Sequence, residues 1–335
     1  MTELGPSGRL DSGERRTALS LEDLTAGLAS VLSASPRELT VADREHNLYS
    51  TSSLSEIVTC RFGPDREEVF LVKREAGSRG RDYGYWGGIA YEAMVYREVL
   101  GPLGVQTPTF FGTFVDETGV VSSVFAFLEG ALRVYQDPQQ RALAGAARWI
   151  GQFHRLASKV NRSARRRLKR YDLAFYAGWA VRTLQLADRE QHGWLVPLCA
   201  NAPGALAALL DEPDVVIHGE FYPSNVLVSD QRIYPVDWET TAIAAGEIDL
   251  AALTDDWPDA AADECERAYA SARWPGGPPS TFARTLDLSR LYLGLRWLGD
   301  RREWTMDDRA ADRYERLRVV GDRLGLTDPR SAGVR

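Results

Sequence analysis

The chain has very little lysine. Of its 335 residues, 40 are basic, but only three of these, Lys73, Lys159 and Lys169, are lysine, so 37 are arginine. A lysine ammonium is a compact point charge, whereas an arginine guanidinium is a planar fork, and the two do not substitute freely. In a chain that so favours arginine, a lysine can mark a position that arginine cannot fill.

Cysteine and histidine are also scarce. The three cysteines lie far apart without a CxxC pair, and the four histidines show no metal-ligand spacing. These absences exclude a disulfide framework and a zinc knuckle, and they fit a reducing compartment. The residues concerned are Cys60, Cys199 and Cys265 together with His46, His154, His192 and His218.

Charge and hydropathy exclude two further classes of protein. The 47 acidic residues outnumber the basic ones, giving a net charge of −7, so the chain lacks the positive field of a general nucleic-acid-binding protein. No apolar run approaches the roughly 18–20 residues needed to span a bilayer, and the first twenty residues have no apolar signal region. We expect a cytoplasmic protein that binds neither nucleic acid nor membrane.

Composition and periodicity predict two lobes. Residues 1–18 read as a flexible tail, 19–128 as a small mostly-β lobe and 129–328 as a larger mostly-α lobe. In the first lobe a helix begins after Ser20, and a second helix covers 90–100. Strands are expected over 39–49, 56–62, 69–72, 109–115 and 120–127.

The second lobe has mainly helical periodicity. Helices are expected over 139–157, 173–186, 204–210, 248–253, 261–272, 281–298 and 306–324. The exception is a hairpin over 215–238. The fold class is therefore α+β, and the cleft between the lobes is the expected ligand site.

The hairpin carries the chemistry. An apolar strand leads to His218-Gly219-Glu220, and Asn225 follows five positions after the acid. A second apolar strand then leads to Asp237. Oxygen ligands of this kind suit Mg²⁺, which takes one or two carboxylates and completes its shell with phosphate and water.

The pattern His-Gly-acid-x4-Asn followed by Asp-Trp-Glu resembles the aminoglycoside phosphotransferase and choline kinase-like superfamily. The resemblance implies a bilobal protein-kinase-like fold and transfer of the γ-phosphoryl group of ATP to a hydroxyl of a small molecule. It further implies that Glu220 takes the hydroxyl proton and that Asn225 and Asp237 bind Mg²⁺.

The same resemblance requires a strand-end lysine paired with a helix glutamate. Lys73 closes the apolar segment 68–73, and Glu92 lies on the expected helix over 90–100. Glu98, on the same helix, is the alternative partner. The resemblance thus assigns Lys73, oriented by Glu92, to the α- and β-phosphates.

Two further segments are implied to bind nucleotide. The stretch 49–58, which contains Ser52, Ser53 and Ser55, would lie over the phosphates, although it lacks the usual glycines. Leu128 and Glu129, in the hinge 127–130, would receive the adenine through their backbone.

One departure from the family leaves two functions open. The family usually has Asp where this chain has Glu220, and the added methylene moves the carboxylate by roughly 1 Å, a shift that can cost ~10²-fold in rate. Either the pocket is built around the longer side chain, or the protein is a pseudokinase-like module that binds a nucleotide or metabolite. No Ala-Pro-Glu segment follows Asp237, which disfavours a protein kinase.

The acceptor and the oligomeric state are not encoded in a readable pattern. The acidic stretch 255–266 with Trp257 is interpreted as an ordinary acidic helix start; the alternative is a site for a cationic acceptor, such as an amino sugar, an antibiotic or an amine. The basic run 155–170 is interpreted as a solvated surface.

Overall fold

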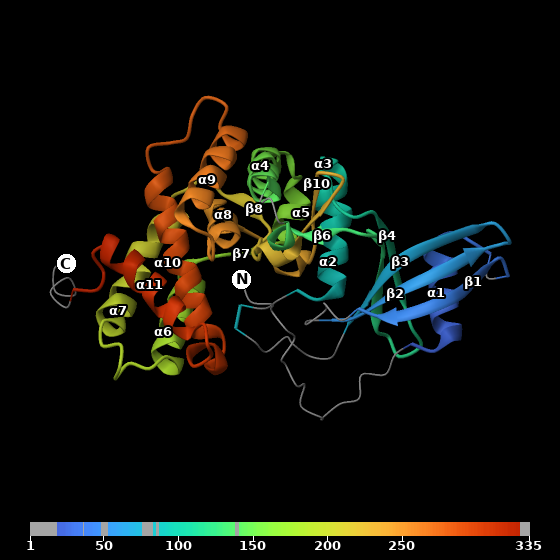
Figure 1. Cartoon of the computed structure of the whole chain (residues 1–335), viewed down its shortest axis with the longest axis horizontal. Helices are drawn as coiled ribbons and strands as arrows, with labels where there is room; N and C mark the ends of the chain where they lie inside the picture. The colour runs from blue at the N-terminus through green and yellow to red at the C-terminus, as the bar shows by residue number, and fades with distance from the viewer. Residues whose placement is uncertain are drawn as a thin grey trace. The chain divides into compact units, whose positions relative to one another are not determined.

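The computed structural model divides the chain into two units, each described here by itself (Figure 1). It describes residues 19–35, 37–47, 53–75, 83–84, 87–137 and 141–328, so the expected tail over 1–18 lies outside the described residues. Unit 1 comprises residues 1–79 and 110–127, and unit 2 comprises 80–109 and 128–335. Residues 80–109, expected in the N-terminal lobe, thus belong to unit 2 by their contacts.

Unit 1 is built on a five-stranded antiparallel sheet with the order β1-β2-β3-β5-β4. Its sequence alternates apolar and polar side chains, so one face of the sheet is buried. The strands are β1 (Leu39–His46), β2 (Leu54–Phe62), β3 (Arg66–Arg74), β4 (Phe110–Val115) and β5 (Val121–Ala126). All five predicted strands are confirmed with shifted ends.

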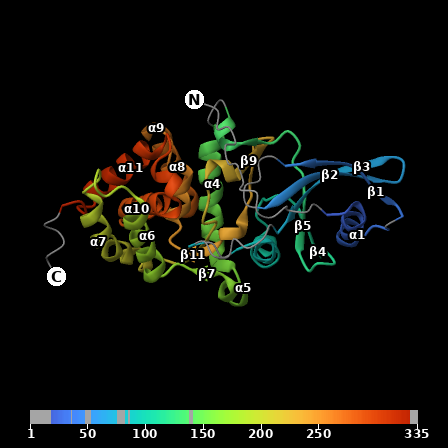
Figure 2. The ribbon, with the colours of Figure 1, turned by 90° about the horizontal axis from the view of Figure 1, so that it is seen from below.

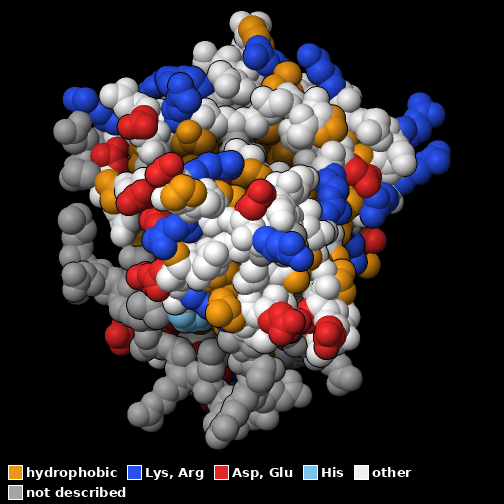
Figure 3. Space-filling model, turned by 90° about the vertical axis from the view of Figure 1, so that its right-hand side faces the viewer, with side chains coloured by type: hydrophobic (Ala, Val, Ile, Leu, Met, Phe, Trp, Pro, Cys, Tyr) orange, Lys and Arg blue, Asp and Glu red, His pale blue; other side chains and the backbone are white. Residues whose placement is uncertain are grey.

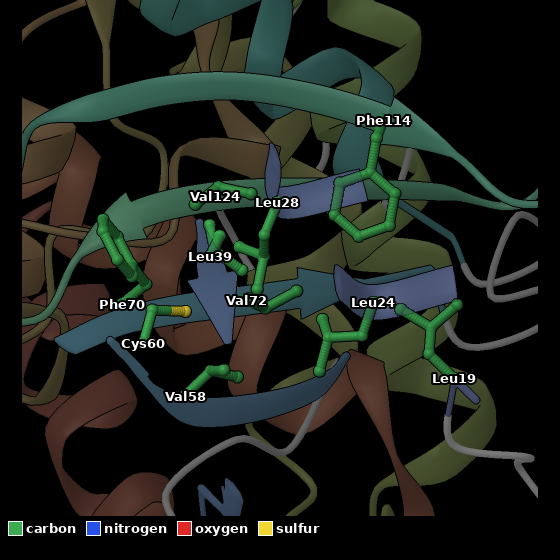
Figure 4. Packing of buried hydrophobic residues seen from close by; sticks show 10 residues of the cluster. All are labelled: Leu19, Leu24, Leu28, Leu39, Val58, Cys60, Phe70, Val72, Phe114 and Val124. Atoms are coloured by element: carbon green, nitrogen blue, oxygen red, sulfur yellow. The ribbon is translucent and has the colours of Figure 1, made fainter. Parts of the chain in front are cut away.

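Helix α1 (Leu21–Val31) covers one face of this sheet. The Ser20 hydroxyl accepts a hydrogen bond from the Asp23 backbone N–H at 3.0 Å, which confirms the predicted cap. Leu24 and Leu28 lie one turn apart and are fully buried. Figure 4 shows them packed with side chains from the strands in one apolar cluster.

The strands also carry exposed charges of both signs. Arg61 pairs with Glu67 at 3.0 Å, and Arg66 pairs with Glu68 at 2.7 Å. Figure 3 shows basic, acidic and hydrophobic side chains interspersed on the face of the molecule turned to the viewer. Exposed pairs of this kind contribute at most about 1 kcal/mol each, so the core and not the surface stabilises unit 1.

Unit 2 is mainly helical. The predicted helix over 90–100 is present as α2 (Ile89–Val95), a π-helical turn η1 (Tyr96–Leu100) and α3 (Gly101–Leu103). The longer helices that follow are α4 (Arg141–Leu156), α5 (Arg162–Arg167), α6 (Leu173–Leu186), α7 (Leu195–Leu206), α8 (Glu247–Thr254), α9 (Asp259–Arg273), α10 (Phe282–Asp300) and α11 (Ala310–Arg323). Figure 2 shows α6, α7, α10 and α11 grouped together, in agreement with their mutual contacts.

Two small sheets interrupt these helices and correct the predicted hairpin over 215–238. One sheet has the order β10-β9-β6 and the other β7-β11-β8. The strand before the His-Gly-Glu motif, β8, therefore pairs with β11, and only β9 and β10 form the hairpin. The strands are β6 (Leu132–Arg133), β7 (Lys169–Arg170), β8 (Val215–Ile217), β9 (Val226–Ser229), β10 (Arg232–Pro235) and β11 (Ala242–Ala244).

The predicted helix over 204–210 is also corrected. Helix α7 begins at Leu195, nine residues earlier, and contains Pro203, while 207–210 form a 3-10 helix, η4. Proline usually breaks a helix interior. Here burial of Leu198, Ala202 and Leu206 at helical spacing outweighs that penalty. The prediction from local helix propensity alone therefore placed this helix at the wrong residues.

The remaining short 3-10 helices link these elements. They are η2 (Val134–Gln136), η3 (Ala157–Lys159), η5 (Pro223–Asn225), η6 (Trp238–Thr240) and η7 (Arg302–Thr305). Over the part of the chain that the structure describes, no helix combines the length and apolar character needed to cross a membrane.

We predict that Leu28→Ala destabilises unit 1 by about 2–5 kcal/mol, because it leaves a cavity in a fully buried cluster. Leu21 on the same helix is 58% exposed and provides a matched control, for which Leu21→Ala is expected to change the free energy of unfolding by less than about 0.5 kcal/mol. Urea unfolding of both variants measures the difference. Equal effects of the two substitutions would contradict the proposed core.

Candidate active site

The loop after β8 is held by one buried carboxylate. The backbone N–H groups of His218 and Gly219 donate to Asp249 Oδ2 and Oδ1 at 2.7 and 2.9 Å. Asp249 lies in the first turn of α8 and is fully buried. Hydrogen bonds to a charged acceptor contribute about 1.5–3 kcal/mol each, so this contact fixes the direction in which the chain enters the loop.

Gly219 is required by this geometry. Its φ is +87°, and a Cβ at this position would lie 2.5 Å from the carbonyl oxygen of Thr240. A side chain would therefore be strained by its backbone conformation and would collide with the backbone of η6. The glycine thus lets Glu220 follow directly on a tightly packed segment.

Two buried histidines brace the loop. His218 Nε2 lies 2.8 Å from the Val236 carbonyl, and the Glu220 N–H donates to His218 Nδ1 at 3.3 Å, which defines a neutral Nε2–H tautomer. His154 lies between Asp249 Oδ2, at 3.1 Å, and the Tyr269 hydroxyl, at 3.0 Å. Burial lowers the pKa of both histidines despite the nearby Asp249 carboxylate.

Asn225 and Asp237 are brought to the same end of the β9–β10 hairpin. Val226 pairs with Pro235 in the ladder, and the Val236 N–H donates to the Asn225 carbonyl at 2.9 Å. The Asn225 amide nitrogen donates to the Glu220 carbonyl at 3.0 Å, which leaves the amide oxygen as its ligand-binding atom. Asp237 has φ +66°, a left-handed conformation that ends β10 sharply.

Glu92 is tied to the turn that carries Asp237. Its carboxylate is buried, and Oε1 accepts the Trp238 backbone N–H at 3.2 Å. The Tyr91 hydroxyl donates to the Thr241 carbonyl at 2.6 Å. A Cβ on Gly87, just before α2, would lie only 1.7 Å from the Glu239 carbonyl oxygen, so this segment packs directly on the turn. Helix α2 thus positions the residue adjacent to Asp237.

The alternative glutamate of this helix has a different partner. Glu98 forms an ion pair with Arg167 of α5 on the surface. Glu92, in contrast, is 1% exposed. Of the two candidates, Glu92 is the one whose carboxylate contacts the Asp237 turn.

The carboxylate of Glu220 has a partner that the sequence did not reveal. Arg296 of α10 donates through Nη2 to Glu220 Oε1 and through Nη1 to the Gly219 carbonyl, the latter at 3.1 Å. The two side chains are 16% and 25% exposed, so the pair is largely buried while Glu220 still reaches solvent. No sequence signal distinguishes Arg296, because it lies 76 residues away on a helix in a chain with 37 arginines.

In unit 1, Lys73 lies near the end of β3 and is 8% exposed. The register places it opposite Ser55 of β2 and Ser123 of β5, on one face of the sheet. Its Nζ lies 5.9 Å from the centroid of the Phe125 ring. Among the described residues, the buried Ser123 hydroxyl has no hydrogen-bond partner. This strand end therefore combines an ammonium with hydroxyls.

The serine segment differs from its prediction. Ser55 lies in β2 and not in a loop, and its hydroxyl accepts from the Asn47 amide at 3.3 Å. Ser53, just before β2, is 5% exposed. Ser52 lies outside the described residues. Strand β2 thus takes up part of the segment expected over the phosphates.

The hinge segment forms a tight turn. The Ala131 N–H donates to the Leu128 carbonyl at 3.2 Å, and Gly130 has φ +69°, as the third residue of a type II turn requires. This bond occupies the Leu128 carbonyl. Glu129 is exposed at the tip of the turn.

The two charge runs are partly paired within unit 2. In the acidic stretch, Asp256 binds Arg309 and Arg316, and Glu266 binds Arg290. In the basic run, Arg170 binds Asp214. Part of the charge in both runs is therefore neutralised by the protein itself.

A family model, described as the phosphotransferase enzyme family, matches residues 90–281, which is more than half of the chain. The chain belongs to the phosphotransferase enzyme family. The match includes Glu92, the loop from His218 to Asn225 and Asp237. The resemblance drawn from the sequence is thereby confirmed. A search of curated proteins finds no matching sequence.

Solved structures give the fold. Choline kinase LicA from Streptococcus pneumoniae is 16% identical, with a TM-score of 0.60 over 88% of this chain and 95% of its own. A choline/ethanolamine kinase family protein from Mesorhizobium loti is 20% identical, with a TM-score of 0.55 over 90% and 94%. Aminoglycoside 2'-phosphotransferase-IIIa in its GDP complex is 12% identical, with a TM-score of 0.62 over 91% and 100%. The predicted α+β protein-kinase-like fold is confirmed.

The donor set at the hairpin end suits a magnesium ion that is shared with phosphates. It offers the Asn225 amide oxygen and the Asp237 carboxylate, and Mg²⁺ in such sites takes its other ligands from phosphate and water. The described residues include no group of three or more His, Cys, Asp and Glu able to hold a metal.

We predict that the free energy of unfolding falls as the pH drops below about 6.5, the ordinary histidine pKa. Because burial lowers the pKa of His154 and His218 in the folded state, the unfolded chain binds protons first as the pH falls. Each histidine contributes a slope of at most about 1.4 kcal/mol per pH unit. Urea titrations between pH 7.5 and 5.5 measure it, and His154→Gln should reduce the slope. An unchanged slope in this variant would contradict the assignment.

Proposed function

We propose that this protein transfers the γ-phosphoryl group of a purine nucleoside triphosphate, ATP in the first instance, to a hydroxyl group of a small molecule with the help of Mg²⁺. Family membership supports phosphotransfer. The residues of the loop and hairpin support Mg²⁺-assisted transfer to a hydroxyl group. The observation that carries the proposal is the placement of Glu220, Asn225 and Asp237 around one loop, where hydrogen bonds to the Glu220 and Asn225 carbonyls hold the loop to the hairpin.

The metal-binding role falls to Asn225 and Asp237. Mg²⁺ held by these two residues would neutralise negative charge on the phosphates during transfer. The left-handed Asp237 turn, fixed through the Trp238 N–H by Glu92, sets the direction of the carboxylate. Positioning of this kind accounts for most of the catalysis in phosphoryl transfer.

Glu220 is the proposed general base. The acceptor oxygen forms a bond to the γ-phosphorus while the bond from that phosphorus to the β–γ bridging oxygen breaks. The hydroxyl proton passes to Glu220 and then to water, and the products are a phosphate monoester and the nucleoside diphosphate. The carboxylate is 25% exposed, so a bound hydroxyl can reach it.

The nucleotide-binding roles in this proposal follow the family resemblance. Lys73, with Ser52, Ser53 and Ser55 nearby in sequence, would bind phosphate oxygens, and Glu92 is the partner that the resemblance assigns to the lysine. The backbone of Leu128 and Glu129 receives the base through groups other than the Leu128 carbonyl, which is used in the turn. Structures of LicA with AMP and of the aminoglycoside phosphotransferase with GDP support a purine nucleotide as the ligand.

The proposed acceptor is a cationic hydroxyl compound such as an amino sugar or an amine. The choline kinase and aminoglycoside phosphotransferase structures support this class. Pairing of Asp256 and Glu266 with arginines means that the acidic stretch alone does not provide the required negative charge. Mass detection of phosphorylated product across cationic and neutral acceptors tests the class directly.

We predict that Asp237→Asn lowers Mg²⁺-dependent phosphotransfer by at least ~10²-fold, because it removes the anionic metal ligand. Asp230→Asn is a matched control. Asp230 also has positive φ and is exposed in the β9–β10 turn, and asparagine tolerates this conformation at both positions. ADP release with a phosphorylated acceptor is the readout. Full turnover in Asp237→Asn would overturn the proposed site.

The alternative function is a binding module without efficient transfer, which the presence of Glu220 in place of Asp favours. Glu220→Asp and Glu220→Ala separate the two. We expect both to lower turnover, Ala the more strongly, with nucleotide affinity by calorimetry within about threefold of wild type. Nucleotide binding by all three proteins with no turnover in wild type would establish the binding module.

A further inference from the structure

Glu220, whose side chain is one methylene longer than that of aspartate, contacts Arg296 of α10 through its carboxylate. Arg296 contacts the loop at two points, the Gly219 carbonyl at 3.1 Å and the Glu220 carboxylate. The first contact is to backbone and does not depend on the side chain at position 220. The guanidinium is therefore held in place by the loop, and the carboxylate is brought to it by the length of the glutamate.

The surroundings of Arg296 restrict its movement. It projects from α10, and Tyr222 and Tyr292 lie close enough to interact with it electrostatically. Tyr222 in turn packs on Trp297, with ring centroids 5.3 Å apart. Asp300, one turn further along α10, is a second carboxylate within electrostatic range of Arg296. Only 16% of the Arg296 side chain is exposed.

We infer that Arg296 is a positioning residue that fixes the carboxylate of Glu220 for proton transfer and so compensates for the longer side chain at this position. An aspartate at 220 would end roughly 1 Å or more short of the guanidinium. The length of the side chain at position 220 is therefore matched to the position of Arg296 on α10. Glutamate is required there because aspartate would not reach the guanidinium. This inference rests on the proposed phosphotransfer.

The first test compares Arg296→Met and Arg296→Lys with wild type. Arg296→Met should lower kcat roughly 10- to 100-fold while the KM for nucleotide stays within about twofold, because the variant disturbs the base and not the nucleotide ligands. Arg296→Lys keeps the charge but replaces the two donor nitrogens of the planar fork by one ammonium, so it should recover part of kcat. Arg290→Met removes another α10 arginine that forms salt bridges and should keep kcat near wild type.

A second test does not depend on turnover. In a double-mutant cycle of Glu220→Gln and Arg296→Met, the loss in melting temperature for the double variant should be smaller than the sum of the two single losses. Additive losses would show that the pair is not coupled and would overturn the inference. An unchanged kcat in Arg296→Met, or equal loss of kcat in the Met and Lys variants, would overturn it as well.

Calorimetry of wild type with Mg²⁺ and nucleotide separates this inference from the proposed function. Absence of both nucleotide binding and turnover would refute the proposed phosphotransfer. The double-mutant cycle would still decide whether Arg296 fixes Glu220. Binding and turnover with a non-additive cycle and rescue by lysine support both proposals.

Discussion

The loop after β8 depends on the carboxylate of Asp249. This carboxylate accepts hydrogen bonds from the consecutive backbone N–H groups of His218 and Gly219, and it also contacts His154, all within a buried region. A buried carboxylate without such donors would be strongly unfavourable, and a buried N–H group without an acceptor would cost about 1–3 kcal/mol. The loop and α8 therefore stabilise each other, and the positive φ of Gly219 allows this arrangement.

Further hydrogen bonds connect this loop to the β9–β10 hairpin. His218 Nε2 contacts the Val236 carbonyl, the Val236 N–H donates to the Asn225 carbonyl, and the Asn225 amide donates to the Glu220 carbonyl. The groups proposed to act on phosphate and hydroxyl are thus connected by hydrogen bonds that each end on a main-chain carbonyl. Glu92 adds a carboxylate that holds the Trp238 N–H next to Asp237. Polar networks of this kind are specific because each member must be satisfied.

Much of this arrangement could be predicted from the sequence. The spacing of Glu220, Asn225 and Asp237, the capped helix after Ser20 and the strand ending near Lys73 are local features, and local features leave local patterns. Contacts between distant segments do not. The pairing of β8 with β11, the extent of α7 through Pro203 and the contact of Arg296 with Glu220 each depend on packing between segments far apart in the chain. Propensity carries no information about such partners.

Arg296 lies beyond residues 90–281, the stretch that matches the family model. The motif that identifies the family and the residue that contacts its acidic side chain therefore belong to different parts of the chain. A chimera that received only the matched stretch would carry Glu220 without α10, and its longer carboxylate would have no anchor. For this protein, the part that suffices for recognition of the family is smaller than the part needed to hold the loop in shape.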